Sequence, residues 1–317
     1  MAVAFTFPGQ GSQAVGMGKD LADAFPEARR VFEEVDAALG EKLSKLIWEG
    51  PEETLTLTAN AQPALMAVSL AAMRALEARG FSLKDKVAYV AGHSLGEYSA
   101  LAAAGFVSVG DAARLLRTRG NAMQAAVPTG EGAMAAIIGL EQADVEAACA
   151  EAAREVGNGS VCQVANDNGG GQLVISGARP AVELAAKLCT EKGAKRALML
   201  QVSAPFHSAL MTPAADIMRE ALAGVAKSAL VVPIVSNVTV TPTSDPDEIA
   251  RRLVEQVVAR VRWRETVEWF GAHGVASLYE VGAGKVLSGL ARRINRDIAT
   301  GAVGTAAEVE ATLAALG

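Results

Sequence analysis

The stretch Lys86–Ala100, KVAYVAGHSLGEYSA, decides the fold of this chain. An apolar run, Val87–Ala91, meets the pattern Gly92-x-Ser94-x-Gly96, and small residues that favour a helix follow. Strand, sharp turn and helix in this order are typical of a nucleophile elbow, where flanking glycines let the chain turn tightly and leave a serine exposed at a helix N-terminus. Backbone N–H groups there favour a developing oxyanion. The pattern predicts a nucleophilic Ser94, with an ordinary capping serine in a strand-to-helix turn as the alternative.

The composition predicts a large core under helices. The chain has 317 residues, of which 51% are hydrophobic and only 4% aromatic, so Ala, Val and Leu supply most of the core. This is typical of helices packed over a buried parallel sheet. The formal net charge of -6 argues against nucleic acid as a partner.

Further features indicate where the protein works. No apolar run reaches membrane-spanning length, and the N-terminus lacks the basic region of a signal peptide, so we expect no membrane partner. Cys149, Cys162 and Cys189 show no metal-ligand spacing and cannot all pair. We therefore expect no metal site and a reducing, cytoplasmic location.

The middle of the chain has the pattern of a second, smaller domain. After residues 128–130 the expected elements are strand, helix, strand, strand, helix and strand, at 133–138, 142–156, 161–165, 172–175, 178–192 and 195–202. This βαββαβ order is that of a ferredoxin-like unit, in which 166–171 is a plain hairpin connection. We expect an α/β fold: an α/β-hydrolase-like catalytic domain with a parallel sheet (1–130 and 203–317) and an inserted ferredoxin-like small domain (131–202).

Only three histidines are available as a general base. His93 is the direct neighbour of Ser94, and adjacent side chains on a tight turn diverge. His273 lies where a helix is expected to end, which favours a capping role. His207 lies in the loop where the inserted segment rejoins the larger domain, and from there it could reach a cleft between the two domains. By elimination His207 is the candidate base, although a lone loop histidine can also be inert.

One arginine lies on the apolar face of a predicted helix. Arg119 shares that face with Ala112, Leu115, Leu116 and Met123. Its long stem could extend to the surface, or a structural carboxylate could pair with it. With Ser94 as a nucleophile, a substrate carboxylate held by the guanidinium fork is the better account.

Five segments, spread over nearly the whole chain, carry a family resemblance. They are Phe7–Gln13 (FPGQGSQ), Gly92–Tyr98 (GHSLGEY), Arg119-Gly120, Pro205–Ser208 (PFHS) and Tyr279–Gly282 (YEVG). Together they resemble the malonyl-CoA:acyl carrier protein transacylases of fatty-acid synthesis and, more broadly, the acyltransferase domains of polyketide synthases.

The resemblance implies a role for each matching residue. Ser94 would be acylated, and His207 would be its base, oriented by a backbone carbonyl instead of a carboxylate. The backbone N–H groups of Gln10 and Leu95 would form the oxyanion hole. Arg119 would hold the malonyl carboxylate, and further substrate-binding residues would be Gln256, Asn166 and Phe206. Phe206 and Leu95 resemble the malonyl-type rather than the methylmalonyl-type pattern.

The resemblance also implies the reaction and the partner. A malonyl group would pass from malonyl-CoA to Ser94 and then to the phosphopantetheine thiol of an acyl carrier protein, with ping-pong kinetics. Malonyl-CoA would be a substrate, phosphopantetheine would be carried by the partner, and no tightly bound cofactor is expected. A serine hydrolase or thioesterase is the alternative, because it shares the elbow, although no clear motif marks a triad acid between Ser94 and His207. A non-catalytic module that docks a carrier protein is a third hypothesis.

Overall fold

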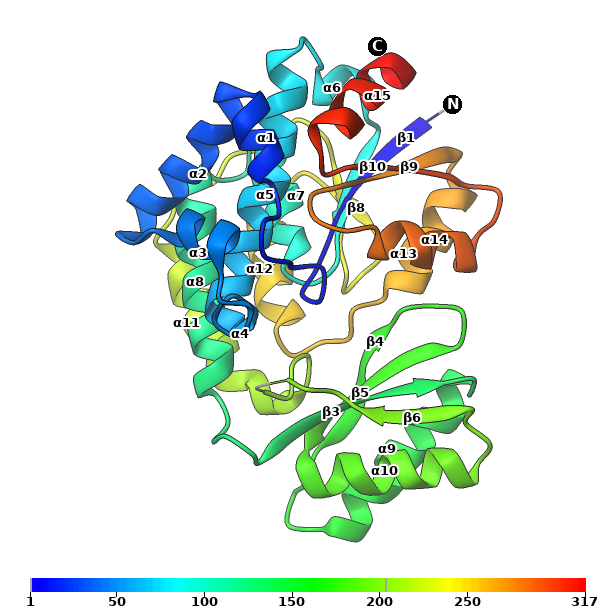
Figure 1. The fold of residues 1–317 in the computed structure, drawn as a ribbon. Coiled ribbons are helices and arrows are strands. Elements are labelled where there is room, and N and C mark those ends of the chain that lie inside the picture. Colours follow the sequence, from blue (N-terminus) through cyan, green and yellow to red (C-terminus); the bar gives the residue numbers. More distant parts are fainter. Residues whose placement is uncertain (1, 203) are drawn as a thin grey trace.

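The computed structural model describes residues 2–202 and 204–317; Ser203, at the start of the second expected segment of the larger domain, lies outside the described residues. Two sheets form separate parts of the molecule (Figure 1). The larger sheet has the order β10-β9-β1-β2-β7-β8. Its strands are β1 (Ala2–Phe7), β2 (Tyr89–Gly92), β7 (Ile234–Val235), β8 (Pro242–Thr243), β9 (Val275–Val281) and β10 (Ala299–Val303). All pair in parallel except β8, which is antiparallel to β7.

The larger sheet is buried on both faces, as its near-continuous apolar strands require. Alternate residues of β1 enter different clusters: Phe5 and Phe7 pack into the main core, and Ala4 packs on the other side. The main core includes residues of α1 (Lys19–Ala24), α2 (Pro26–Leu39), α3 (Leu43–Glu49), α5 (Thr58–Ala78), α7 (Gly96–Ala103), α8 (Val109–Ala125) and α11 (Thr212–Ala223). The second cluster includes residues of α13 (Trp263–Ala272) and α14 (Val286–Ile294).

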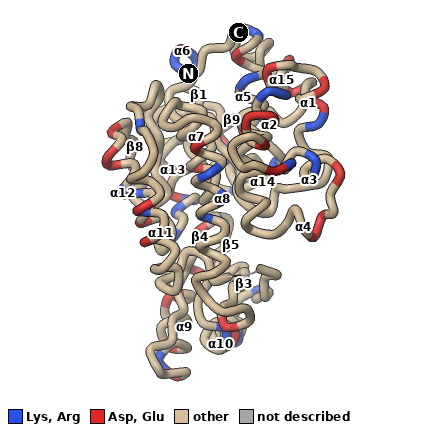
Figure 2. The backbone as a smooth tube through the Cα atoms, turned by 90° about the vertical axis from the view of Figure 1, so that its left-hand side faces the viewer, with Lys and Arg blue, Asp and Glu red and all other residues tan. Residues whose placement is uncertain are grey.

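Four further described helices and a short 3-10 helix also contribute buried residues to the main core. They are α4 (Glu52–Thr56), α6 (Leu83–Lys86), α12 (Pro246–Gln256), α15 (Ala306–Leu316) and a short 3-10 helix, Ala209–Met211. Figure 2 shows acidic and basic residues interspersed along the outer helices, which fits a chain of modest net charge.

The smaller sheet is antiparallel, with the order β4-β5-β3-β6. Its strands are β3 (Gly132–Ile138), β4 (Cys162–Asp167), β5 (Gln172–Ala178) and β6 (Arg196–Met199), and α9 (Gln142–Val156) and α10 (Arg179–Glu191) pack on it. The order along the chain is βαββαβ. The expected fold class, a mixed α/β fold with a parallel sheet and a second, antiparallel unit, is confirmed. The domain boundaries at 130 and 203 stay predictions.

Two strands differ from the expectation. The strand expected at 195–202 is only four residues long. A strand is also expected at 230–235, where Pro233 would confine it to a sheet edge or a bulge. The edge position is wrong: β7 covers only Ile234–Val235 and lies between β2 and β8. Pro233 precedes β7 and contributes only its carbonyl, which accepts from Val90 N at 3.0 Å, so its missing N–H removes no bond from the ladder.

The turn between β2 and α7 depends on two glycines. A Cβ at Gly92 would lie 1.9 Å from the carbonyl carbon of Gly96, and a Cβ at Gly96 would lie 2.1 Å from the carbonyl oxygen of Phe7. Both distances are far inside van der Waals contact with rigid backbone. The glycines therefore bring the start of α7 directly against the end of β1.

We expect the substitution Gly96→Ala to lower the free energy of unfolding by about 2 kcal/mol or more, because the added methyl group overlaps backbone that cannot move aside. Urea unfolding followed by circular dichroism measures the loss. The matched control is Gly289→Ala in α14, where a Cβ meets no atom within 4 Å. There the substitution should raise stability by about 0.5–1 kcal/mol, since glycine in a helix interior is unfavourable. Equal stability of wild type and Gly96→Ala would contradict this account of the turn.

Candidate active site

Ser94 occupies the turn in a left-handed backbone conformation, with a φ of 54°. Its N–H donates to Asn237 Oδ1 at 2.9 Å, and Asn237 Nδ2 donates to the carbonyl of Gly92 at 2.6 Å. One asparagine from the loop after β7 thus binds the chain on both sides of the serine. This fixes the direction in which Ser94 Oγ points.

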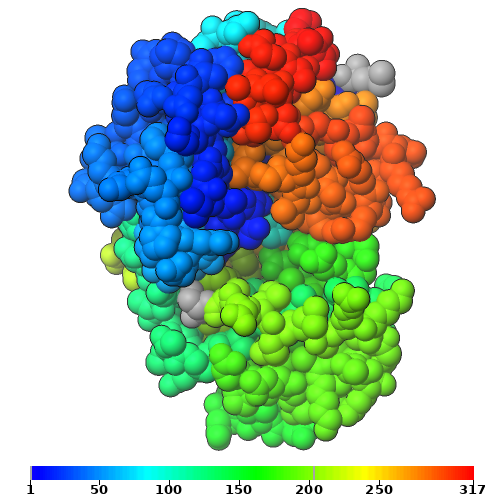
Figure 3. All heavy atoms as spheres, in the orientation of Figure 1, coloured from blue at the N-terminus to red at the C-terminus, as the bar shows by residue number. Residues whose placement is uncertain are grey.

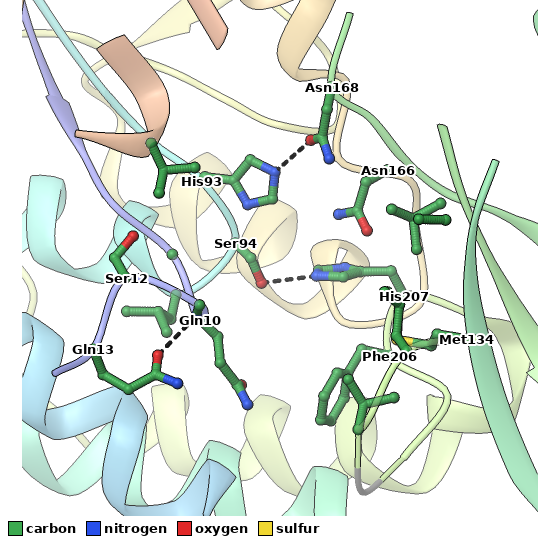
Figure 4. Close-up of a pocket in the computed structure, with 18 of the residues that line it drawn as sticks. Gln10, Ser12, Gln13, His93, Ser94, Met134, Asn166, Asn168, Phe206 and His207 are labelled. Carbon is green, nitrogen blue, oxygen red and sulfur yellow. Dashed lines mark hydrogen bonds between the residues drawn. The ribbon is translucent and has the colours of Figure 1, made fainter. Parts of the chain in front are cut away.

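His207 lies beside Ser94 (Figure 4), with 2.7 Å between His207 Nε2 and Ser94 Oγ. The other ring nitrogen, Nδ1, lies 2.9 Å from the carbonyl oxygen of Gln256 and 3.2 Å from that of Ala259. Carbonyl oxygens only accept, so Nδ1 carries the proton and Nε2 is free to accept from the serine hydroxyl. Burial and, next, the charge of Arg119 lower the pKa of His207 to about 3. The imidazole is therefore neutral at neutral pH.

The other two histidines lie where the sequence places them. His93 turns away from Ser94 and makes a hydrogen bond of 2.9 Å from Nε2 to Asn168 Oδ1 (Figure 4). His273 caps the C-terminus of α13 and stacks on Trp269 with 3.9 Å between ring centroids. Elimination among the three histidines therefore selects the one that contacts the serine.

Arg119 is a buried cation, 1% exposed, that faces Ser94. Nη1 donates to Gln62 Oε1 at 2.8 Å, and Nη2 donates to Gln256 Oε1 at 2.9 Å and to Ser94 Oγ at 3.1 Å. The guanidinium lies 5.6 Å from the centroid of the Tyr98 ring. Among the residues that the structure describes, Arg119 makes no ion pair, and its Nε is buried without a hydrogen-bond partner. Both alternatives, a surface-exposed head group and a structural carboxylate partner, are therefore wrong.

Two backbone N–H groups near Ser94 are available to a ligand. Those of Gln10, in the loop after β1, and of Leu95, the N-cap residue of α7, donate to no other residue in the described parts of the chain. The Gln10 side chain donates instead to Thr58 Oγ1 at 3.3 Å. The position of the two N–H groups fits the predicted oxyanion hole, and that role stays a prediction.

The serine, histidine and arginine open into a cavity of about 480 Å³. Asn166 on β4 and Phe206, which precedes His207, also line it, as does Gln10 (Figure 4). No hydrogen bond joins the Asn166 side chain to another described residue, although Asn166 is only 7% exposed. Figure 3 shows a hollow where the blue N-terminal segment, the orange C-terminal segment and the green small-sheet unit meet. The cavity is therefore lined on one side by residues that follow strands of the larger sheet, such as Gln10 and Ser94, and on the other by strand residues of the smaller sheet.

Sequence reasoning missed several residues around the cavity. Asn168, assigned to a plain hairpin connection, binds His93, and Asp167 is buried and pairs with Arg264 Nε at 2.7 Å. Asn237 and Glu97 were not singled out. Glu97 is a charged residue at the start of a helix of otherwise small or apolar residues, all but the last of them buried. This contrast is the one sequence signal that could have identified Glu97 as a site residue. Burial raises the pKa of Glu97 to about 7, while hydrogen bonds from Asn237 and Gln256 act in the opposite direction.

Within the described ranges, 2–202 and 204–317, no group of three or more His, Cys, Asp or Glu side chains could hold a metal ion. The three cysteines are buried and free. No described helix is both long enough and apolar enough to span a membrane.

The chain is similar to known acyltransferases along nearly its whole length. The family model described as an acyl transferase domain matches residues 4–292. The malonyl CoA-acyl carrier protein transacylase of Bacillus subtilis (strain 168) is 46% identical over 314 residues, 99% of this chain and 97% of the relative. That of Escherichia coli (strain K12) is 49% identical over 291 residues, 92% of each chain.

Solved structures agree with the sequence comparisons. The acyl-carrier-protein-S-malonyltransferase from Bartonella henselae is 63% identical, with a TM-score of 0.97 over 100% of this chain and 99% of that one. A malonyl-transacylase in complex with a type II PKS acyl-carrier protein is 43% identical, with a TM-score of 0.94 over 99% of this chain and 100% of that one. This chain belongs to the malonyl-CoA:acyl carrier protein transacylase family.

Proposed function

We propose that this protein transfers a malonyl group from malonyl-CoA to the phosphopantetheine thiol of an acyl carrier protein, through a malonyl ester on Ser94. The observation that carries the proposal is the buried charge of Arg119, which pairs with no described carboxylate and whose Nη2 lies 3.1 Å from Ser94 Oγ. A serine nucleophile with a cation beside it fits an acyl group that ends in a carboxylate.

The first half-reaction follows from the contacts of Ser94. His207 Nε2 takes the hydroxyl proton while Oγ attacks the thioester carbonyl carbon. The N–H groups of Gln10 and Leu95 stabilise the oxyanion of the tetrahedral intermediate. When the C–S bond breaks, the proton on His207 goes to the sulfur, so coenzyme A leaves as a thiol and the malonyl ester remains.

The second half-reaction runs the same steps with a different thiol. His207 deprotonates the phosphopantetheine thiol of the carrier protein, whose sulfur attacks the ester carbonyl, and the proton returns to Ser94 Oγ. Coenzyme A and phosphopantetheine act only as carriers of the acyl group, so the scheme requires no tightly bound cofactor. We place the reaction in the cytoplasm, because the three cysteines are free thiols.

Two observations support the partner and the direction of transfer. One relative was solved in complex with an acyl carrier protein, and curated relatives are named transacylases, which favours a thiol over water as the acceptor. Arg293, an exposed cation on α14, lines the cavity, where it suits an acidic partner.

Ser94→Ala tests the covalent intermediate. After incubation with malonyl-CoA, intact-protein mass spectrometry should show a malonyl adduct on the wild-type protein and none on the variant, because the variant lacks the only proposed nucleophile. An adduct that persists on the variant would end the proposal. Adding a carrier protein or water alone to the isolated adduct distinguishes transfer from hydrolysis.

Arg119→Ala tests the carboxylate site. Removing the guanidinium should lower kcat/KM for malonyl-CoA by about a hundredfold, the upper range for a lost hydrogen-bonded charge, and spare acylation by acetyl-CoA. Competition between the two thioesters for Ser94, followed by adduct mass, measures the change. An unchanged preference for malonyl would refute the role of Arg119.

The low pKa of His207 predicts its behaviour on titration. Free histidine titrates near pH ~6.5, but the buried imidazole of His207 should stay neutral through that range and gain a proton only at distinctly lower pH. Its ring resonances, assigned by their absence in His207→Gln, can be followed by NMR as pH falls. A midpoint near the ordinary value would show that burial and Arg119 do not keep this base unprotonated.

A further inference from the structure

Glu97 is a buried carboxylate that neither the catalytic scheme nor the carboxylate site uses. It lies in the first turn of α7 and is 3% exposed. Among the described residues it makes no ion pair, and hydrogen bonds satisfy it instead. Oε1 accepts from the backbone N–H of Asn237 at 2.9 Å, and Oε2 accepts from Gln256 Nε2. A carboxyl group is costly to bury, so a specific role is to be expected.

The contact with Gln256 settles how that side-chain amide is oriented. Its Nε2 donates to Glu97 and to the carbonyl of Ser94 at 2.9 Å, and its Oε1 accepts from Arg119 Nη2 at 2.9 Å. In its ionised form the Glu97 carboxylate only accepts hydrogen bonds, so this form binds the NH2 end of the amide. Rotating the amide by half a turn would set an oxygen against Glu97 and an NH2 group against the guanidinium, which is unfavourable at both ends.

The second glutamine on Arg119 lacks such a partner. Gln62 Oε1 accepts from Arg119 Nη1 at 2.8 Å, but among the described residues its own Nε2 meets only the sulfur of Met123 at 3.8 Å, a weak acceptor. Of these two glutamines, Gln256 is the one held by a carboxyl group. The three described acceptors on Arg119, two glutamine oxygens and Ser94 Oγ, are neutral, which leaves its charge available to a ligand.

We propose that Glu97 is a positioning residue for substrate selectivity: by holding Gln256 in one orientation, it keeps Arg119 where the carboxylate of the acyl group binds. This inference rests on the proposed malonyl transfer. Glu97 touches neither Ser94 Oγ nor His207, so its loss should reduce the preference for a carboxylate-bearing acyl group more than it reduces acylation itself.

The experiment compares wild type and Glu97→Gln by single-turnover acylation of Ser94, with malonyl-CoA and acetyl-CoA in separate reactions followed by intact mass. The variant keeps the size of the side chain and an oxygen for Asn237, but its NH2 faces that of Gln256 and turns the amide around. We expect the second-order rate constant for acylation by malonyl-CoA to fall about tenfold or more, the effect of losing a hydrogen bond to a charged group, mainly through weaker binding. The acetyl-CoA rate should change little.

Asp36→Asn is the matched control for loss of a buried carboxylate. Asp36 is 5% exposed and accepts from Ser44 N at 2.9 Å, in α2 and away from the cavity. This variant should lose stability and keep the wild-type preference for malonyl. If Glu97→Gln does not fold, Glu97→Asp gives the same test, since the shorter side chain cannot reach Asn237 and Gln256 together.

The outcomes separate this inference from the proposed function. If the wild-type protein shows no preference for malonyl-CoA, the proposed function fails. If the wild type prefers malonyl-CoA and both Glu97 variants keep that preference, or lose both activities equally, the positioning role of Glu97 is overturned.

Discussion

The left-handed backbone at Ser94 is the constraint on which the site depends. A residue other than glycine in this region costs on the order of 1–3 kcal/mol, and it persists only where the surroundings hold it. Here Asn237 binds the chain on both sides, and two glycines allow α7 to press against β1. His207 also has a positive φ, 55°. The backbones of Ser94 and His207 are thus both strained. Ser94 Oγ and His207 Nε2 lie 2.7 Å apart because strands, helix ends and loops from distant parts of the chain converge there.

The second property of the site is the buried positive charge of Arg119. Arg119 is taken out of water without a carboxylate partner, at a cost that two glutamine oxygens, one serine hydroxyl and the Tyr98 ring offset only in part. A fold selected for stability alone would pair or expose such a charge. Perturbed groups of this kind cluster at functional sites, and burial here also raises the pKa of Tyr98 to about 12.

The sequence could predict those features that follow from local pattern. The glycine spacing predicted the elbow at Ser94, helical periodicity put Arg119 on the buried face, and the βαββαβ order predicted the antiparallel unit. It could not predict contacts between segments far apart in the chain. Asn237 lies 143 positions from Ser94, and Asn168 lies 75 positions from His93. No local sequence pattern around either asparagine indicates its role, and each reaches its partner only in the folded chain. The sheet-edge position expected for the strand around Pro233 is wrong because this proline precedes β7 and contributes only its carbonyl to the pairing.

The coupling between Arg119 and His207 has a consequence for the reaction itself. Positive charge on the guanidinium is one of the causes that lower the pKa of the imidazole. An acyl group that brings its own negative charge to Arg119 cancels part of this effect and makes His207 a stronger proton acceptor at the moment when the hydroxyl must be activated. An uncharged acyl group would leave the imidazole of His207 as weak a base as it is in the empty site. With the carboxylate bound at Arg119 as proposed, the substrate would therefore assist its own turnover, and discrimination would arise in the chemical step as well as in binding.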